Sequence, residues 1–183
     1  MIPSVLVLLA EGFEEVEAIT PIDLLRRSGA KVTVASLDTL AVKGSHGIVI
    51  HADTTLEACK DKTFTAVVLP GGGQGAKNLA ASFPVLEKVI ETSQHGIVGA
   101  ICAAPAVVLG KTGLLDGKRV TGYPGTESCC PSLKLEDEPC IVDGSLVTGQ
   151  GPGAAMAFSL ALIGLLFDEK TKDAIAGQLY YKG

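Results

Sequence analysis

The order of strand and helix patterns in the first 36 residues constrains the fold most strongly. Val5–Ala10 is an apolar run of strand length, and the turn Glu11-Gly12 follows it. Residues 14–28 then carry apolar side chains at helical spacing, and Lys31–Ser36 reads as a second strand. A strand–helix–strand opening of this kind predicts a parallel sheet with helices on its faces.

The rest of the chain continues the same pattern. Further buried strands are expected at Ala66–Leu69 and Ile97–Ile101, with a helix between them that begins near Pro84. A hairpin around Asp143-Gly144 and two closing helices, over 154–167 and 171–179, are also expected. Val42–His51, interrupted by glycines, reads as a small hairpin or an irregular excursion. We predict one α/β domain over residues 1–183, built on an open, doubly wound sheet.

The charge and hydropathy of the chain exclude several classes of partner. The net charge is −5 and the pI about 5.2, with no basic stripe that could neutralise phosphates, so no dedicated nucleic-acid site is expected. The longest apolar stretch, Ala154–Phe167, is shorter than the ~20 residues of a membrane span. Met1–Ser4 lacks the basic start of a secretory signal, so the expected location is cytoplasmic.

The cysteines and histidines argue against a disulfide framework and a metal centre. The chain has five cysteines, an odd number, and no CxxC motif. Its three histidines, His46, His51 and His95, lack metal-ligand spacing, so neither a zinc enzyme nor any other metal site is expected.

Three candidate segments follow predicted strands. They are Glu11–Glu17, Pro70–Gly75 and Cys102–Pro105. Ligand sites of doubly wound sheets form beyond the carboxyl ends of the strands, so these three segments are expected to meet there.

Cys102 is the strongest candidate for a reactive group. It directly follows a predicted strand and precedes a helix, as the nucleophile of a strand–turn–helix elbow does. A helix N-terminus lowers a thiol pKa, so we expect a depressed pKa at Cys102. Buried, inert cysteines are equally common, and the local sequence leaves both interpretations open.

The other two segments offer groups that could assist a thiol. The amides of Gly71-Gly72-Gly73 could form an oxyanion site with the amide of Cys102 or Ala103, although a tight turn explains the glycines as well. Glu17 lies near the apolar face of its helix, where a carboxyl beside a thiol could act as acid and base. Glu14 and Glu15 are expected to be exposed and stabilised by the helix dipole.

These segments together resemble the ThiJ/PfpI superfamily, in the branch of the parkinsonism-associated protein deglycase and its bacterial relatives. The resemblance covers nearly the whole chain. The matching residues are Leu8-Leu9-Ala10-Glu11-Gly12-Phe13-Glu14-Glu15-Val16-Glu17, Asp23-Leu24-Leu25-Arg26-Arg27-Ser28-Gly29, Val68-Leu69-Pro70-Gly71-Gly72, Ala100-Ile101-Cys102-Ala103-Ala104-Pro105 and Gly149-Gln150-Gly151-Pro152-Gly153.

The resemblance implies a flavodoxin-like fold, a homodimer and a chemistry without a cofactor. It implies that Cys102 is the nucleophile and Glu17 its protonated partner. Gly72 and the Cys102–Ala103 backbone become the oxyanion site. Ala103 stands where family proteases carry a histidine, which argues against a Cys-His protease.

Two further positions depart from the family pattern. Tyr123 stands where many relatives carry a histidine, and it is expected to wall the pocket or to position the substrate. His46 aligns with an arginine of relatives. It could reach the site of a neighbouring subunit, or it could be a plain surface histidine.

The function that the resemblance implies is a glutathione-independent glyoxalase acting on small dicarbonyls such as methylglyoxal. Deglycation of early adducts on proteins or nucleotides, and a role in oxidative and carbonyl stress defence, are part of the same expectation. The alternative is a redox sensor or holdase chaperone that uses oxidation of Cys102.

Overall fold

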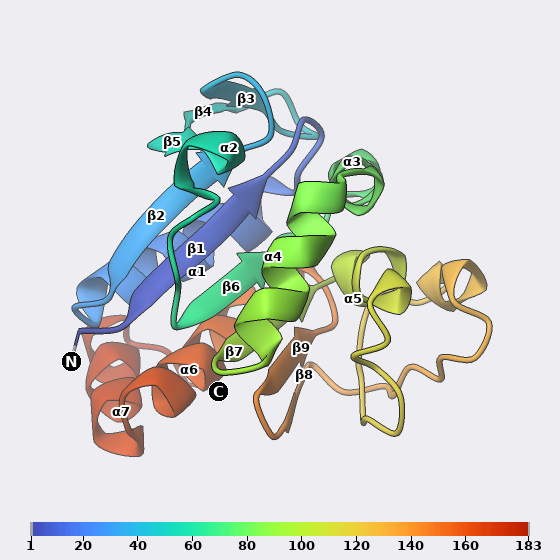
Figure 1. Cartoon of the computed structure of the whole chain (residues 1–183). Coiled ribbons are helices and arrows are strands. Elements are labelled where there is room, and N and C mark those ends of the chain that lie inside the picture. The colour runs from blue at the N-terminus through green and yellow to red at the C-terminus, as the bar shows by residue number, and fades with distance from the viewer. Residues whose placement is uncertain (1, 183) are drawn as a thin grey trace.

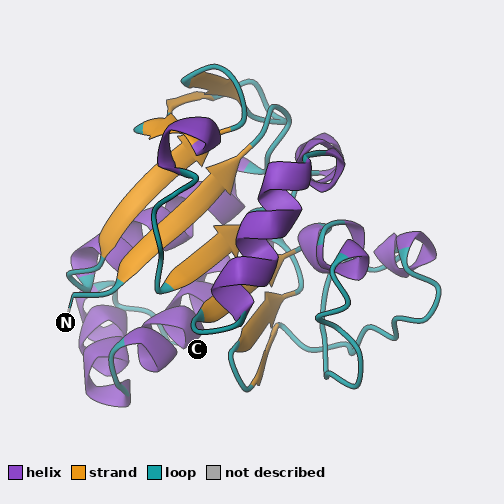
Figure 2. Cartoon of the chain, viewed as in Figure 1, coloured by secondary structure: helices purple, strands orange, loops and turns teal. Residues whose placement is uncertain are grey.

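A seven-stranded sheet forms the centre of the computed structural model, which describes residues 2–182 (Figures 1 and 2). The strand order is β5-β2-β1-β6-β7-β9-β8, and all neighbours are parallel except β8 and β9. The strands are β1 (Ser4–Leu9), β2 (Lys31–Ser36), β5 (Thr54–Thr55), β6 (Ala66–Leu69), β7 (Ile97–Ile101), β8 (Cys140–Asp143) and β9 (Leu146–Gly149). The predicted doubly wound, flavodoxin-like α/β sheet is confirmed.

Helices cover both faces of this sheet. One face carries α1 (Glu15–Arg27), α6 (Ala155–Leu166) and α7 (Glu169–Gln178), where α6 packs between the other two. The opposite face carries α2 (Leu56–Cys59), α3 (Gly73–Ala81), α4 (Phe83–Ser93) and α5 (Ala104–Val107); α4 lies in front of the sheet in Figure 1. Short 3-10 turns occur at Leu109–Lys111, Thr126–Cys129 and Pro152–Ala154.

The buried strands explain why the sheet forms the core. β6 is completely buried, and β1 is buried from Val5 onward, as expected of parallel strands covered on both faces. Val7 pairs with Val68, which in turn pairs with Gly99, so β1, β6 and β7 run side by side in register. Their carboxyl ends therefore meet at one edge of the sheet, where the strand order reverses.

The excursion after β2 is a two-stranded hairpin of β3 (Ala41–Lys43) and β4 (Val49–His51). It packs over the start of α1, because Gly12 N donates to Lys43 O and Ser45 N donates to Phe13 O. The expected hairpin is confirmed, and it brings the 44–48 turn next to Glu14 and Glu15.

Two features of the helices differ from the expectations. The glycine-rich segment after β6 was expected to be a loop, but Gly73 begins the nine-residue helix α3. In α1, Val16 and Ile19 point outward and are 49% and 45% exposed, whereas Glu15 and Glu17 are buried. Among residues 2–182 there is no helix long and apolar enough to cross a bilayer.

Candidate active site

Cys102 occupies a strained turn between β7 and α5. Its φ is +65°, a left-handed conformation that a side chain with a Cβ rarely adopts. Two backbone hydrogen bonds hold it there: Cys102 N donates to Gly149 O (2.8 Å), and Tyr123 N donates to Cys102 O (2.8 Å). The strand–turn–helix arrangement is that of a nucleophile elbow, which lifts the side chain above the sheet edge.

Glu17 reaches the same edge from α1 and is completely buried. Its Oε2 accepts a hydrogen bond from Gly71 N at 2.8 Å. Its Oε1 is buried as well and has no hydrogen-bond partner within residues 2–182. A carboxyl with one oxygen engaged and the other unsatisfied is costly to bury in ionised form.

Gly71 lies between these two side chains. A Cβ at position 71 would sit 2.6 Å from Cys102 Cβ and 2.6 Å from Glu17 Oε2, so any larger residue would collide with both. The structure therefore brings Cys102 and Glu17 together, as the sequence predicted, and it requires glycine between them.

The ionisation of the two groups is coupled. Burial raises the pKa of Glu17 to about 7; its hydrogen bonds with Cys102 and Gly71 oppose that rise. Burial, followed by the charge of Glu17 and the hydrogen bond with it, raises the pKa of Cys102 to about 12. The expected depressed pKa of Cys102 is thus wrong. The helix α5 has only four residues, and the pKa-lowering effect of its N-terminus is smaller than the pKa-raising effects of burial and of the Glu17 carboxylate. The pair sheds its first proton near neutral pH and holds the second tightly.

The predicted oxyanion site has two amides close to the sulfur. Hydrogen bonds from the backbone of Gly72 and of Ala103 act on the Cys102 thiol and favour its ionised form. Gly72 has φ +87°, and a Cβ there would run into Gly12 O and the amide of Glu14. Because Glu14 N also donates to Gly71 O (3.0 Å), the turns after β1 and β6 are locked together.

Tyr123 lies at the rim of the site. Its amide bonds to Cys102, its side chain is half exposed, and its ring lies close to Gly151. It lines an open cavity of about 670 Å³ together with Pro124, Pro139, Gln150, Gly151, Pro152, Gly153 and Ala154. Neither Cys102 nor Glu17 lines this cavity, so the role of Tyr123 as a wall or a substrate-positioning residue stays a prediction.

His46 is not brought to Cys102 within one chain. It lies in the turn between β3 and β4, its side chain is 69% exposed, and its Nδ1 is 2.9 Å from Glu15 Oε2. The hydrogen bond with Glu15, followed by the charges of Glu14 and Glu15, raises the pKa of His46. Its predicted role at a neighbouring subunit's site remains a proposal.

Glu15 corrects one expectation of the sequence analysis. It was expected to be exposed, but it is only 5% exposed. Burial opposes its ionisation, yet hydrogen bonds with the His46 ring, with the backbone of Glu15 and His46 and with Ser45 lower its pKa to about 2. Gly44 makes the approach possible, because a Cβ there would overlap the Glu15 carboxyl. Gly44 was the sequence signal that could have indicated the contact between Glu15 and the β3–β4 turn.

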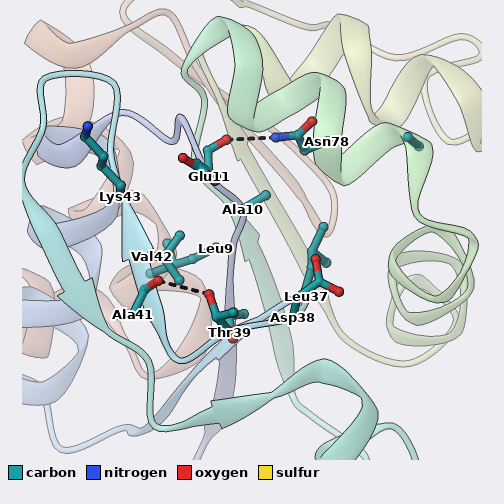
Figure 3. Close-up of a pocket in the computed structure, with 12 residues that line it drawn as sticks. Leu9, Ala10, Glu11, Leu37, Asp38, Thr39, Ala41, Val42, Lys43 and Asn78 are labelled. Atoms are coloured by element: carbon teal, nitrogen blue, oxygen red, sulfur yellow. Dashed lines mark hydrogen bonds between the residues drawn. The ribbon is translucent and has the colours of Figure 1, made fainter.

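A separate cavity of about 480 Å³ opens beyond β1 and β2 (Figure 3). Asn78 Nδ2 donates to Glu11 O across one side of it (2.9 Å), and Thr39 Oγ1 donates to Ala41 O on the other (3.1 Å). No predicted site residue lines this cavity, so it is not the reactive centre.

Comparisons with known proteins agree with this arrangement. The model of the DJ-1/PfpI family matches residues 3–165. Protein DJ-1 homolog A of Arabidopsis thaliana is 39% identical over 96% of the chain, which spans 46% of that relative's length. A Caenorhabditis elegans relative named glutathione-independent glyoxalase DJR-1.2 is 34% identical, with 87% of each chain covered.

The solved structures give the same answer for the fold. The structure of oxidized Toxoplasma gondii DJ-1 superposes with a TM-score of 0.94 and 37% identity, covering 99% of this chain and 100% of that one. The family model matches most of the sequence, and relatives more than 30% identical cover most of the chain. These two findings assign the family. The chain belongs to the DJ-1/PfpI family.

Proposed function

We propose that this chain is a glutathione-independent glyoxalase that converts small α-ketoaldehydes such as methylglyoxal into 2-hydroxy acids. The observation that carries the proposal is the pair of Cys102 and Glu17 on either side of Gly71, with two backbone amides beside the sulfur. A relative that bears the glyoxalase name supports it.

The first step is attack of the Cys102 sulfur on the aldehyde carbon. The thiol proton passes to Glu17, whose Oε1 has no other partner within the described chain, while Oε2 stays bound to Gly71. The carbonyl oxygen becomes the oxyanion of a hemithioacetal, and the amides of Gly72 and Ala103 are placed to stabilise it. A carboxyl with a pKa of about 7 suits proton exchange at neutral pH.

The second step moves hydrogen between adjacent carbons. Glu17 first gives the thiol proton to the oxyanion, which restores its carboxylate. The carboxylate then removes the proton from the former aldehyde carbon while the ketone oxygen takes a proton from water, giving an enediol. Glu17 returns its proton to the neighbouring carbon as the hydroxyl on the sulfur-bearing carbon loses its proton to water and becomes the thioester carbonyl. The product is a thioester of a 2-hydroxy acid on Cys102. Water cleaves this thioester, releasing the acid and restoring the thiol. The sum is ketoaldehyde plus water giving hydroxy acid, so the reaction needs no external oxidant, reductant or cofactor.

The proposal extends to early glycation adducts on proteins or nucleotides, because such adducts keep a carbonyl group that the same sulfur can attack. A cellular role in carbonyl and oxidative stress defence follows from that substrate class, and the location that we propose is the cytoplasm.

Lactate formation from methylglyoxal by the purified chain, without glutathione, tests the main proposal. We expect turnover in the native chain and none with Cys102→Ala, whose small side chain leaves the packing nearly unchanged. Turnover in both proteins would remove the assigned nucleophile, and turnover in neither would reject the glyoxalase.

A redox sensor is the second candidate, favoured by the oxidized state named for the Toxoplasma gondii structure. A sensor would oxidise Cys102 in mild peroxide without turning over dicarbonyls. Absence of lactate formation together with selective oxidation of Cys102 would favour it over the glyoxalase.

We also propose a homodimer formed through the outer face of α1. Four large apolar side chains are exposed on α1 and on the β3–β4 hairpin that packs over the start of α1: Val16 (49%), Ile19 (45%), Ile48 (57%) and Val49 (58%). Large exposed apolar side chains on neighbouring elements are typical of an interaction site. Ile19→Lys is expected to give monomers in light scattering, whereas Ile90→Lys, on α4 and 38% exposed, should not. Dimers that survive Ile19→Lys would place the interface elsewhere.

A further inference from the structure

Four polar groups converge where the β3–β4 turn meets the start of α1. Glu14 and Glu15 come from the helix start, and Ser45 and His46 come from the turn, about thirty positions later in the sequence. The imidazole Nδ1 and one oxygen of each carboxylate all lie within 4.8 Å of one another. Imidazole nitrogen and carboxylate oxygen are both ligands that zinc binds in proteins.

Five of the six distances among these four atoms lie between 2.9 and 3.6 Å, and the sixth, between the two carboxylate oxygens, is within 4.8 Å. His46 Nδ1 is 2.9 Å from Glu15 Oε2 and 3.6 Å from Glu14 Oε2. Ser45 Oγ is 3.0 Å from His46 Nδ1 and 3.2 Å from each of the two carboxylate oxygens. Ligands at the zinc–nitrogen and zinc–oxygen distances of ~2.0–2.1 Å lie ~3.3 Å apart around a tetrahedral ion. The five known separations bracket the spacing that such an ion requires.

The charges at this position also favour a cation. Glu15 is buried, and Glu14 is only partly exposed. Within residues 2–182, neither carboxylate forms an ion pair with a lysine or an arginine; His46 is their shared partner. An imidazole proton can balance one of the two negative charges, whereas a divalent ion on the neutral imidazole balances both.

We propose that Glu14, Glu15 and His46 form a binding site for a first-row divalent cation of the zinc type, with Ser45 or a water at the fourth corner. The imidazole and the low ligand number select zinc over calcium, which takes six to eight oxygens, and over magnesium, which keeps its waters. The ion would join α1 to the hairpin. Histidine spacing along the sequence could not reveal this site, because its ligands come from two distant segments.

Zinc binding to the full chain tests the proposal. The measurement is a zinc chloride titration, by calorimetry or by competition with a chromophoric chelator, in a chain carrying Cys102→Ser, Cys129→Ser and Cys130→Ser. These changes remove the thiols most able to compete for the metal. We expect one zinc ion per chain. His46→Arg, which keeps a positive charge but cannot ligate, should weaken binding by at least ~100-fold, since even indirect ligand partners contribute 10–100-fold.

His95→Arg is the matched control, because His95 is also exposed and lies on the other side of the fold after α4. It should bind zinc as the parent does. Cobalt in place of zinc should give a tetrahedral visible spectrum without a thiolate charge-transfer band in the native chain. The proposal is overturned by any of three results: no saturable zinc binding in the millimolar range, equal binding in His46→Arg, or binding that disappears with the three cysteines.

Discussion

Cys102 Cβ and Glu17 Oε2 lie equally far, 2.6 Å, from the point that a Cβ on Gly71 would occupy. Cys102 directly follows β7 and Glu17 lies in α1, so the two residues are distant in sequence, and the missing side chain at position 71 lets them meet. The proposed chemistry depends on this gap.

Gly71→Ala is therefore expected to abolish dicarbonyl turnover. The added methyl group would displace Cys102 or Glu17, and Ile101 O at 2.9 Å blocks the remaining side. Such overpacking typically destabilises a protein by about 1–3 kcal/mol. Gly73→Ala is the matched control, since a Cβ there meets nothing within 4 Å. Lactate assays and urea unfolding compare the two variants, and an active Gly71→Ala would mean that the pair tolerates separation.

Glu17→Gln should slow both adduct formation and turnover, because glutamine cannot take the thiol proton. The amide keeps the shape and can still accept from Gly71 N, but it cannot carry a proton between carbons. Loss of general acid–base catalysis typically costs ~10²–10⁴ in rate. Steady-state kinetics measure the loss, and mass spectrometry follows the adduct on Cys102. A rate within a few-fold of the native rate would show that another group moves the proton.

The raised pKa of Glu17 also predicts a pH-dependent stability. Because the folded protein holds this proton more tightly than the unfolded chain, the contribution is fully present below about pH 4.5 and is lost as the pH rises to about 7. The loss amounts to about 3 kcal/mol, at 1.36 kcal/mol per pKa unit. Urea unfolding between pH 4.5 and 8 should show this decline in the native chain and a shallower one in Glu17→Gln. Parallel curves for the two proteins would contradict the raised pKa.

Tyr123→Phe should cost less than about tenfold in kcat/KM, or under ~1.4 kcal/mol of transition-state stabilisation. The backbone of residue 123 holds Cys102, and the ring lines the cavity, so the hydroxyl is dispensable if Tyr123 only walls the pocket. Tyr123→Gly should cost more, since it removes the wall. A loss of kcat/KM well above tenfold in Tyr123→Phe would instead show that the Tyr123 hydroxyl positions the substrate.

Much of the fold could be predicted because the strands are buried on both faces and read as continuous apolar runs. The predicted bounds of Lys31–Ser36, Ala66–Leu69 and Ile97–Ile101 match β2, β6 and β7. The helix α3 was missed because Gly73-Gln74-Gly75 reads as a loop. In the structure both glycines lie in the first turn of a helix, where the close packing of Gly75 against Phe13 and Gly12 outweighs the low helix propensity of glycine.

The meeting of Cys102, Glu17 and the glycine turn could be predicted from the sheet order. The electrostatics could not, because a pKa depends on burial and on neighbours brought from other segments. The face of α1 also remained ambiguous: helical spacing marks Val16 and Ile19 as apolar, but it does not distinguish the core of one chain from the surface that a second chain would cover. Glu15 is buried for a reason that lies thirty residues away, in the hairpin turn.

The backbone bonds that hold Cys102 have a consequence for the newly made chain. One of its partners, Gly149, belongs to β9, the last strand of the sheet in chain order, and it is translated well after Cys102. Before β9 pairs with β7, the hydrogen bond from Cys102 N to Gly149 O is absent. Without that bond the strained φ of +65° is not stabilised, and Cys102 adopts an ordinary backbone conformation. The turn conformation of Cys102 therefore forms only when the sheet is complete. In a nascent or partly unfolded chain, Cys102 is an ordinary thiol that lacks this conformation.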